Sequence, residues 1–205
     1  MALDDSDPGR ALRGLLREPT LKPHEIARAL DSMSHVERVR AIRATSRADQ
    51  RRLYRAVEGA RALGMSDVVP PQMPALAPVR HHGKNTLPAF TWFEKRFCRP
   101  ADADPHQPDR LWGYNEQSLR WLTGPGYFVL RPAPRPGELV VDYTCVPGER
   151  PAAWPEIRPN ERGLSRFVYG FMVDTLRGVS THVSIGSAAR HGRDIGSWFL
   201  LCRED

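Results

Sequence analysis

The residues best suited to chemistry lie in one stretch, VRHHGKNTLPAFTWFEKRFCRP, which runs from Val79 to Pro100. It places two histidines, a lysine and a glutamate next to a run of aromatic side chains. Imidazole, ammonium and carboxylate groups are the usual acids, bases and anion ligands of proteins. The candidate ligand-binding residues are therefore His81, His82, Lys84, Asn85, Thr86 and Glu94.

Glu94 is the most unusual residue of this stretch. Asn85 and Thr86 are suitable N-cap residues and Pro88 suits a first helical turn, so we expect a helix to begin near residue 86. In that helix Glu94 projects into an apolar face, where it must find a partner, become protonated or bend out to water. A salt bridge to an arginine is the structural outcome, and an acid or base at a pocket rim is the functional one. The residues expected on the apolar face are Leu87, Phe90, Phe93 and Phe97.

The segment HHGKN supports two interpretations. Backbone amides at a helix start, with Lys84 and a histidine nearby, would receive a carboxylate or phosphate group. Alternatively, His81 and His82 point to opposite faces of an extended chain and have unrelated roles. That geometry also argues against both rings binding one metal, and the seven histidines show no H-x-x-x-H or H-E-x-x-H spacing. The sequence predicts no metal site and indicates no particular cofactor.

Common catalytic motifs are absent from the sequence. It contains no G-x-S-x-G elbow, Walker loop or G-x-G-x-x-G fingerprint. A generic hydrolase or kinase therefore has no support. The enzyme hypothesis that remains assigns Glu94 as a general acid or base assisted by a histidine. A binding protein is favoured over this enzyme.

The composition is that of an ordinary globular chain. Its 205 residues are 40% hydrophobic and 26% charged, which suits one domain or a domain with an appendage. No apolar run approaches the roughly 20 residues of a membrane span, and the segment MALDDSDPGR lacks the features of a secretory signal. Three widely spaced cysteines indicate reduced thiols rather than disulfides. We expect a cytoplasmic protein without a membrane partner.

A net charge of +6 raises the question of nucleic-acid binding, although only three of the 30 basic residues are lysines. LKPHEIARALDSMSHVERVRAIRA superficially resembles a helix-turn-helix. However, Asp31 stands where glycine usually permits the turn, and Glu37 stands where an apolar residue is expected. The arginines of residues 28–55 also spread over several helix faces, as in a solvated bundle. An interaction or nucleic-acid-binding module is thus the second alternative function.

The chain divides by composition into four parts. Residues 1–20 are expected to form a mobile tail with about one helical turn, and residues 21–64 a helical segment. Ser34 and Glu37 have the spacing of a capping box within it. Residues 65–79 form a proline-rich connector, and residues 80–205 an α+β domain with an antiparallel sheet.

Two hairpins are predicted in the last part. Strands 127–131 and 138–144 are joined by PAPRPG, and strands 181–190 and 195–202 by a turn at residues 191–194. The proline-rich segment VPGERPAAWPEIRPNERG between the hairpins is long enough for a lid or binding loop. For residues 167–179 we expect a strand first and then a short helix that ends at Val179.

Several phrases, among them HHGKN, WLTGPGYFVL and SWFLLCRED, resemble bacterial proteins to which no activity is assigned. More loosely, the order of elements is similar to small lipocalin-like barrels that hold apolar ligands. The G-x-W signature of lipocalins is missing, since Trp112-Gly113 has the opposite order. The resemblance implies a helical N-terminal segment followed by an antiparallel sheet that curls into a partial or closed barrel with flanking short helices.

The leading hypothesis is therefore a cytoplasmic binding protein for a small, partly apolar ligand with an acidic group. Lys84, Asn85, Thr86 and a histidine would meet the acid. The sequence leaves open which aromatic residues form the apolar walls, what the oligomeric state is and which ligand binds.

Overall fold

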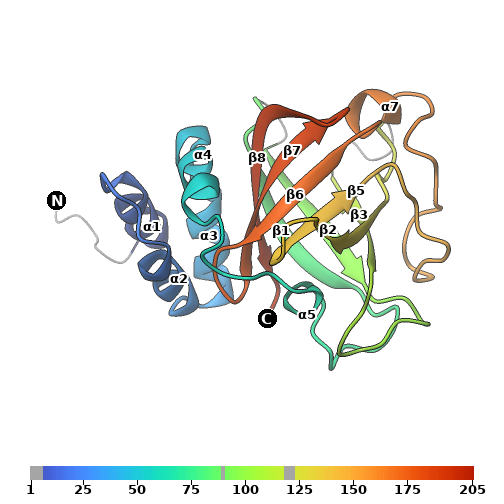
Figure 1. Ribbon diagram of the computed structural model, residues 1–205, viewed down its shortest axis with the longest axis horizontal. Coiled ribbons are helices and arrows are strands. Elements are labelled where there is room, and N and C mark those ends of the chain that lie inside the picture. Colours follow the sequence, from blue (N-terminus) through green and yellow to red (C-terminus); the bar gives the residue numbers. More distant parts are fainter. Residues whose placement is uncertain (1–6, 89–90, 118–122) are drawn as a thin grey trace.

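Eight strands form a closed antiparallel barrel in the computed structural model, which describes residues 7–88, 91–117 and 123–205. Each strand pairs with the next one along the chain, and the last closes on the first (Figure 1). The expected α+β fold with a lipocalin-like barrel is confirmed. The strands are β1 (Val79–Asn85), β2 (Trp92–Cys98), β3 (Leu111–Glu116), β4 (Phe128–Pro132), β5 (Glu138–Asp142), β6 (Val173–Gly178), β7 (Val183–Arg190) and β8 (Arg193–Arg203).

The barrel interior is filled at one end and open at the other. Side chains alternate between the two faces of each strand, so every second residue of β1 to β8 points inward. The inward core includes Phe97, Leu111 and Leu176, which are fully buried. The short helix α5 (Met65–Val68) belongs to the same core and covers the end of the barrel at which β1 begins.

The first four helices form a segment that packs on the outer face of the barrel. They are α1 (Pro8–Arg17), α2 (Pro23–Asp31), α3 (His35–Arg43) and α4 (Arg47–Ala56). Figure 1 shows α3 and α4 next to the barrel and α1 and α2 farther away. A second core joins the helices to β7 and β8, with fully buried Leu53 and Ile42 on one side and Ile185 and Leu200 on the other.

The described part of the expected N-terminal tail, from residue 7 onward, contains a helix of ten residues. Helix α1 lies within the expected tail, and its Leu12 and Leu16 are fully buried against the other helices. The capping box at the start of α3 is confirmed, because Glu37 accepts from the Ser34 backbone amide while the Ser34 hydroxyl caps the Glu37 amide. These local signals begin each helix, and the shared apolar core holds them together.

The proline-rich segment between the two hairpins packs on the side of the barrel. Trp154 is buried against Tyr114 and Tyr127 on the outer face of β3 and β4. The side-chain amide of Asn160 donates to the carbonyls of Tyr127 and Tyr143. The part of this segment around Trp154 and Asn160 is therefore a wall that covers an outer apolar surface.

Two expectations about secondary structure are wrong. No helix begins near residue 86, because β1 extends to Asn85 and β2 begins at Trp92; Phe90 lies outside the described residues. The order within residues 167–179 is also reversed, since helix α7 (Ser165–Val168) precedes strand β6. In both segments the spacing of aromatic and β-branched residues is compatible with a helix as well as a strand. Hydrogen-bonded pairing with neighbouring strands selects the strand.

Both predicted hairpins are confirmed. Strands β4 and β5 pair across PAPRPG, and β7 pairs with β8. The second turn is tighter than expected, because only His191 and Gly192 separate the strands. Both residues have positive φ, as two-residue hairpin turns require.

Candidate functional site

A cavity of about 350 Å³ opens at the end of the barrel opposite α5. Helix α7 and the residues that follow it lie beside the opening. The cavity surface is mainly apolar, with a few polar side chains that point inward from different strands. Such a concave, mostly apolar space with few polar groups is typical of small-molecule sites.

Lys95 is the cation of this cavity. It lies on β2, is 2% exposed and donates hydrogen bonds to Asn115 Oδ1 at 2.8 Å and to the Tyr143 hydroxyl. Its Nζ also lies 4.7 Å from the centre of the Phe128 ring and 5.2 Å from that of Phe199. Burial lowers the pKa of Lys95 to about 8. An ammonium group has three protons, so this one can still donate to a ligand.

Asp174 brings a carboxyl group into the same cavity from β6. It is 2% exposed, and its Oδ1 is buried without a hydrogen-bond partner among the described residues. Burial raises the pKa of Asp174 to about 7, although the positive charge of Lys95 opposes the rise. At neutral pH the carboxyl group can therefore both donate and accept a proton.

Tyrosines complete the polar end of the cavity. The Tyr143 and Tyr169 rings stack with their centres 5.5 Å apart, and the Tyr169 hydroxyl accepts from Gln117 Nε2 at 2.7 Å. Burial raises the pKa of both tyrosines above the ordinary value, so both phenols stay neutral. These hydroxyls offer hydrogen bonds without adding charge.

The rim of the cavity is apolar and exposed. Phe167 of α7 is 73% exposed, and Leu87 and Ile195 are about half exposed on the same rim. Arg190 holds α7 in place by donating to the carbonyls of Phe167 and Val168. Exposed apolar residues around an opening favour access by a ligand that is itself partly apolar.

The structure separates the site residues predicted from the sequence. Asn85 alone among them lines the cavity. His81 points inward at the closed end, where its Nε2 lies 2.9 Å from the Val68 carbonyl and burial lowers its pKa to about 3. The Thr86 hydroxyl accepts from the Trp198 backbone amide at 3.0 Å and so ties the end of β1 to β8.

The expectation that Glu94 points into an apolar layer is wrong. Because β2 is a strand, Phe93 and Lys95 point inward and Glu94 points outward. Its Oε2 accepts from Arg96 at 3.0 Å and lies 3.6 Å from Arg80 Nε. Lys84 and His82 share this outer face, since they alternate with inward-facing residues of β1. The charged side chain that points into the barrel is thus that of Lys95, one residue after the predicted Glu94.

Sequence reasoning missed Lys95, Asn115, Tyr143 and Asp174. They come from four separate parts of the chain, so no local motif connects them. Asp174 points into the barrel, whereas Arg177, three residues later on β6, points to the outer face. Arg177 donates to Glu138 at 2.8 Å and lies 4.1 Å from the centre of the Tyr54 ring.

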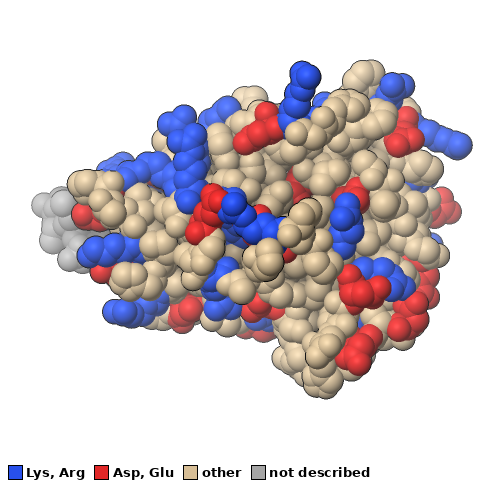
Figure 2. Space-filling model, viewed as in Figure 1, with Lys and Arg blue, Asp and Glu red and all other residues tan. Residues whose placement is uncertain are grey.

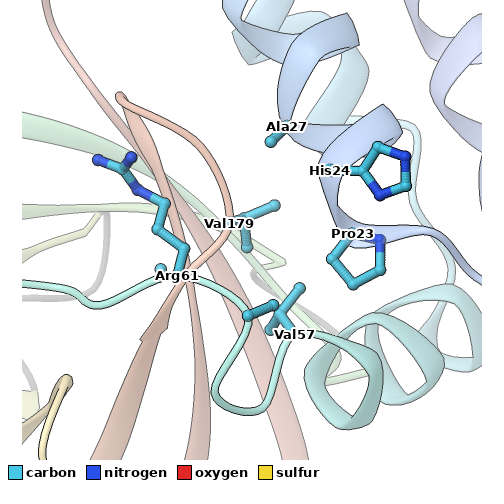
Figure 3. Close-up of a pocket in the computed structure, with 8 residues that line it drawn as sticks. Pro23, His24, Ala27, Val57, Arg61 and Val179 are labelled. Atoms are coloured by element: carbon cyan, nitrogen blue, oxygen red, sulfur yellow. The ribbon is translucent and has the colours of Figure 1, made fainter.

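A second cavity, of about 240 Å³, lies between α2 and the side of the barrel (Figure 3). Its walls include Ala27, Val57 and Val179. The His24 ring turns away from Val179, and the Arg61 guanidinium extends away from the cavity to Asp67. No polar groups converge there among the residues described, so the barrel cavity is the better candidate site.

Several arginines of the helical segment are engaged within the molecule. Arg38 is buried and pairs with Asp205, Arg52 donates to carbonyls of Leu16 and Glu18 at the end of α1, and Arg47 donates to the Gly196 carbonyl. In the view of Figure 2, lysines and arginines alternate with acidic residues over the surface. On this face the mixed charge differs from the continuous basic surface typical of nucleic-acid-binding proteins.

Compared with known proteins, the chain matches no protein-family model, no curated protein and no solved structure. Among the described helices, none combines the length and the apolar character that a membrane crossing needs. The geometry of the barrel cavity therefore carries the functional argument.

Proposed function

We propose that the protein is a cytoplasmic binding protein for a small, partly apolar molecule with an acidic group. The ligand would enter the open end of the barrel and place its acid against Lys95. The observation that carries this proposal is a buried ammonium group at the polar end of a mainly apolar cavity of about 350 Å³. That volume lies at the lower end of the range for small-molecule pockets. The three free cysteines support a reducing compartment.

The charges of the cavity favour an anionic ligand. A buried cation without a close counter-charge costs several kcal/mol. Lys95 gives its hydrogen bonds to neutral partners, and the pKa of Asp174 leaves that carboxyl group only partly ionised at neutral pH. A carboxylate in the cavity would accept from Lys95 and also from protonated Asp174. Its negative charge would compensate the ammonium group directly.

The remaining walls would hold the apolar part of the ligand. Phe93, Met172 and Phe199 line the cavity between the polar end and the rim. Burial of apolar surface contributes about 25 cal/mol for each Å² removed from water. A short alkyl chain or one aromatic ring joined to a carboxylate fits both this surface and the cavity volume.

Calorimetric titration with octanoate and 3-phenylpropanoate tests this proposal. Lys95→Met should weaken binding of both probes at least about tenfold, because a charge-assisted hydrogen bond contributes roughly 1.5–3 kcal/mol. Lys84→Met is the matched control, since Lys84 sits on the outer face of β1 and should leave affinity unchanged. Octanamide, which is uncharged, should bind more weakly than octanoate. Equal affinities of the wild type and Lys95→Met for octanoate would contradict the proposal.

The pair Lys95 and Asp174 also favours a second candidate, an enzyme that forms an imine with a carbonyl substrate. An amine with a lowered pKa is a nucleophile near neutral pH, and a carboxyl group with a raised pKa can transfer the protons. The Lys95 nitrogen would attack the carbonyl carbon and water would leave. In this hypothesis Asp174 is the general acid or base, a role that the sequence had assigned to Glu94, which points outward.

Reductive trapping distinguishes this enzyme from a binding protein. Borohydride added with benzaldehyde would reduce the C=N bond to a stable secondary amine, which adds a benzyl group to the mass of the protein. The enzyme hypothesis expects this addition on Lys95 of the wild type and of Lys84→Met. Labelling that persists unchanged in Lys95→Met would contradict it.

A further inference from the structure

Two histidine rings meet where the helical segment contacts the barrel. His35 is the first residue of α3, and His82 lies on the outer face of β1. Their ring centres are 5.3 Å apart, with an angle of 49° between the ring planes. The two residues are far apart in the sequence, so only the packing of α3 on the barrel brings them together.

Glu204 adds a carboxylate to the two rings. It directly follows β8, and its backbone amide donates to the Arg80 carbonyl at 2.9 Å, which fixes the chain there. One ring nitrogen of His35, one of His82 and one carboxylate oxygen of Glu204 all lie within 4.8 Å of one another. Three elements of the fold thus direct one potential ligand atom each to the same point.

Each of the two rings has a buried nitrogen that lacks an ordinary partner. His35 Nδ1 and His82 Nδ1 are both buried without a hydrogen bond to any described residue. A buried polar atom without a partner costs roughly 1–3 kcal/mol, so two of them in neighbouring rings require an explanation. Two imidazole nitrogens and a carboxylate oxygen form a donor set that suits Zn²⁺. We propose that His35, His82 and Glu204 bind a divalent transition-metal ion, with zinc as the best fit.

The distances allow a tetrahedral site after small side-chain rotations. Metal–ligand bonds of about 2.1 Å place tetrahedral ligand atoms about 3.4 Å apart, and the three atoms now lie within 4.8 Å of one another. Glu94 supplies a candidate fourth ligand, since its Oε1 lies 3.9 Å from His82 Nδ1. Its other oxygen remains on Arg96 and would keep the carboxylate oriented, as outer partners of metal ligands usually do.

Arg80 is the group that competes with a metal ion. Its Nε lies 3.8 Å from Glu204 Oε2 and 3.6 Å from Glu94 Oε2. Both contacts are longer than hydrogen bonds, and the Arg80 side chain is 40% exposed. The guanidinium can therefore move into water when a metal ion takes its place between the two carboxylates.

The site would attach the helical segment to the barrel. Its ligands come from the start of α3, the middle of β1 and the chain after β8. An ion that binds only this folded arrangement stabilises it according to its concentration and affinity. The inferred role is therefore structural, and it is independent of ligand binding in the barrel cavity.

Zinc titration of tag-free protein, freed of metal with a chelator, tests the site. We expect one Zn²⁺ per chain and a melting temperature that rises with zinc. Co²⁺ in the same site should give the visible absorption of tetrahedral cobalt with nitrogen and oxygen ligands. His35→Gln and His82→Gln should each lower the affinity at least about tenfold, since loss of even an outer partner costs that much. His24→Gln, at an exposed position on α2, is the control and should behave like the wild type.

These variants allow loss of zinc binding to be distinguished from loss of folding. The hydroxyl and carboxylate that cap α3 belong to Ser34 and Glu37, so His35→Gln leaves the cap in place. Melting curves without zinc would show that each variant is folded before the titration. Absence of stoichiometric zinc binding by the wild type would overturn the proposal. Unchanged binding by folded His35→Gln and His82→Gln would overturn it as well.

Discussion

Lys95 and Asp174 place two ionisable groups inside the barrel, where each charge is costly. Burial is the largest cause of both pKa changes, and the attraction between the two groups only partly offsets it. Lys95 donates hydrogen bonds to Asn115 Oδ1 and to the Tyr143 hydroxyl, whereas Asp174 Oδ1 has no hydrogen-bond partner among the described residues. Groups with these properties in a cavity are more typical of a functional site than of a structural ion pair.

The pH dependence of stability should report this arrangement. The pKa of folded Asp174, about 7, lies above the ordinary 3.8, so its contribution to the free energy of unfolding falls as pH rises from about 4 to 7. The pKa of folded Lys95, about 8, lies below 10.5, so its cost is present below pH 8 and disappears as pH rises toward 10.5. Lys95→Met/Asp174→Asn should therefore be more stable than the wild type by up to a few kcal/mol, most strongly at pH 7–8.

Urea denaturation at a series of pH values measures this difference. The control is Arg158→Met/Glu156→Gln, which removes one positive and one negative charge from a largely exposed pair. Its stability relative to the wild type should vary little with pH. A difference between Lys95→Met/Asp174→Asn and the wild type that stays constant from pH 4 to 10 would contradict the burial of the two charges.

Proton uptake should accompany ligand binding at the same two residues. A bound carboxylate next to Asp174 favours the protonated form, so binding raises the pKa of Asp174 and takes up part of a proton near pH 7. Titrations with octanoate in buffers of different ionisation enthalpy should give apparent enthalpies that depend on the buffer. Asp174→Asn should remove most of that dependence. If Asp174→Asn and the wild type take up the same number of protons, another group is responsible.

Glycines on the strands decide how aromatic rings fit inside the barrel. Gly83 pairs with Phe93, Gly113 with Phe128 and Gly186 with Phe199 across neighbouring strands. A Cβ atom at Gly83 would lie 2.5 Å from the Phe93 ring, and one at Gly186 would overlap the Phe199 ring. Each ring therefore lies over the space left by its glycine partner. Two of these rings, those of Phe93 and Phe199, also form the walls of the cavity.

Gly186→Ala should therefore lower stability by about 1–3 kcal/mol, because the Phe199 ring must leave its position. Chemical denaturation measures the change, and weaker binding of octanoate should accompany it. Gly14→Ala is the matched control: position 14 lies within α1 and has open space around it, so the change should be neutral or stabilise by up to about 1 kcal/mol. Equal stability of Gly186→Ala and the wild type would show that the ring can move without cost.

Elements marked by a few neighbouring residues could be predicted from the sequence, whereas elements that depend on pairing with distant strands could not. PAPRPG and His191-Gly192 mark hairpin turns by themselves, and Ser34 with Glu37 marks a helix start. The spacing of Phe93 and Phe97 is compatible with both a helix and a strand, and only pairing with β1 and β3 selects the strand. Glu94 was predicted to point inward because this segment was expected to be a helix, whereas in the strand Phe93 and Lys95 point inward and Glu94 points outward. Convergence of Lys95 and Asp174 requires the closed barrel, which no local pattern specifies.

The helices and the barrel share one apolar core, and this should make the whole molecule unfold as a unit. Leu53 of α4 is fully buried in the core that also contains Ile185 of β7 and Leu200 of β8. Two-state unfolding is the expected behaviour where such a core continues across two parts of a chain. The alternative is an appendage that melts first and leaves the barrel intact.

Leu53→Ala tests this cooperativity. Loss of a fully buried leucine should cost about 2–5 kcal/mol, and the barrel should become less stable together with the helices. All five tryptophans follow the helical segment in the sequence. Fluorescence of Trp112 and Trp154 reports on the barrel, and that of Trp92 and Trp198 also reports on its contact with α3 and α4, whereas circular dichroism at 222 nm reports mainly on α1 to α4. Both signals should shift together to lower urea concentration in Leu53→Ala, while Val36→Ala, at a position that is 57% exposed, should shift neither. A loss of helical signal at urea concentrations where the tryptophan signal is unchanged would show that the barrel is stable without the helical segment.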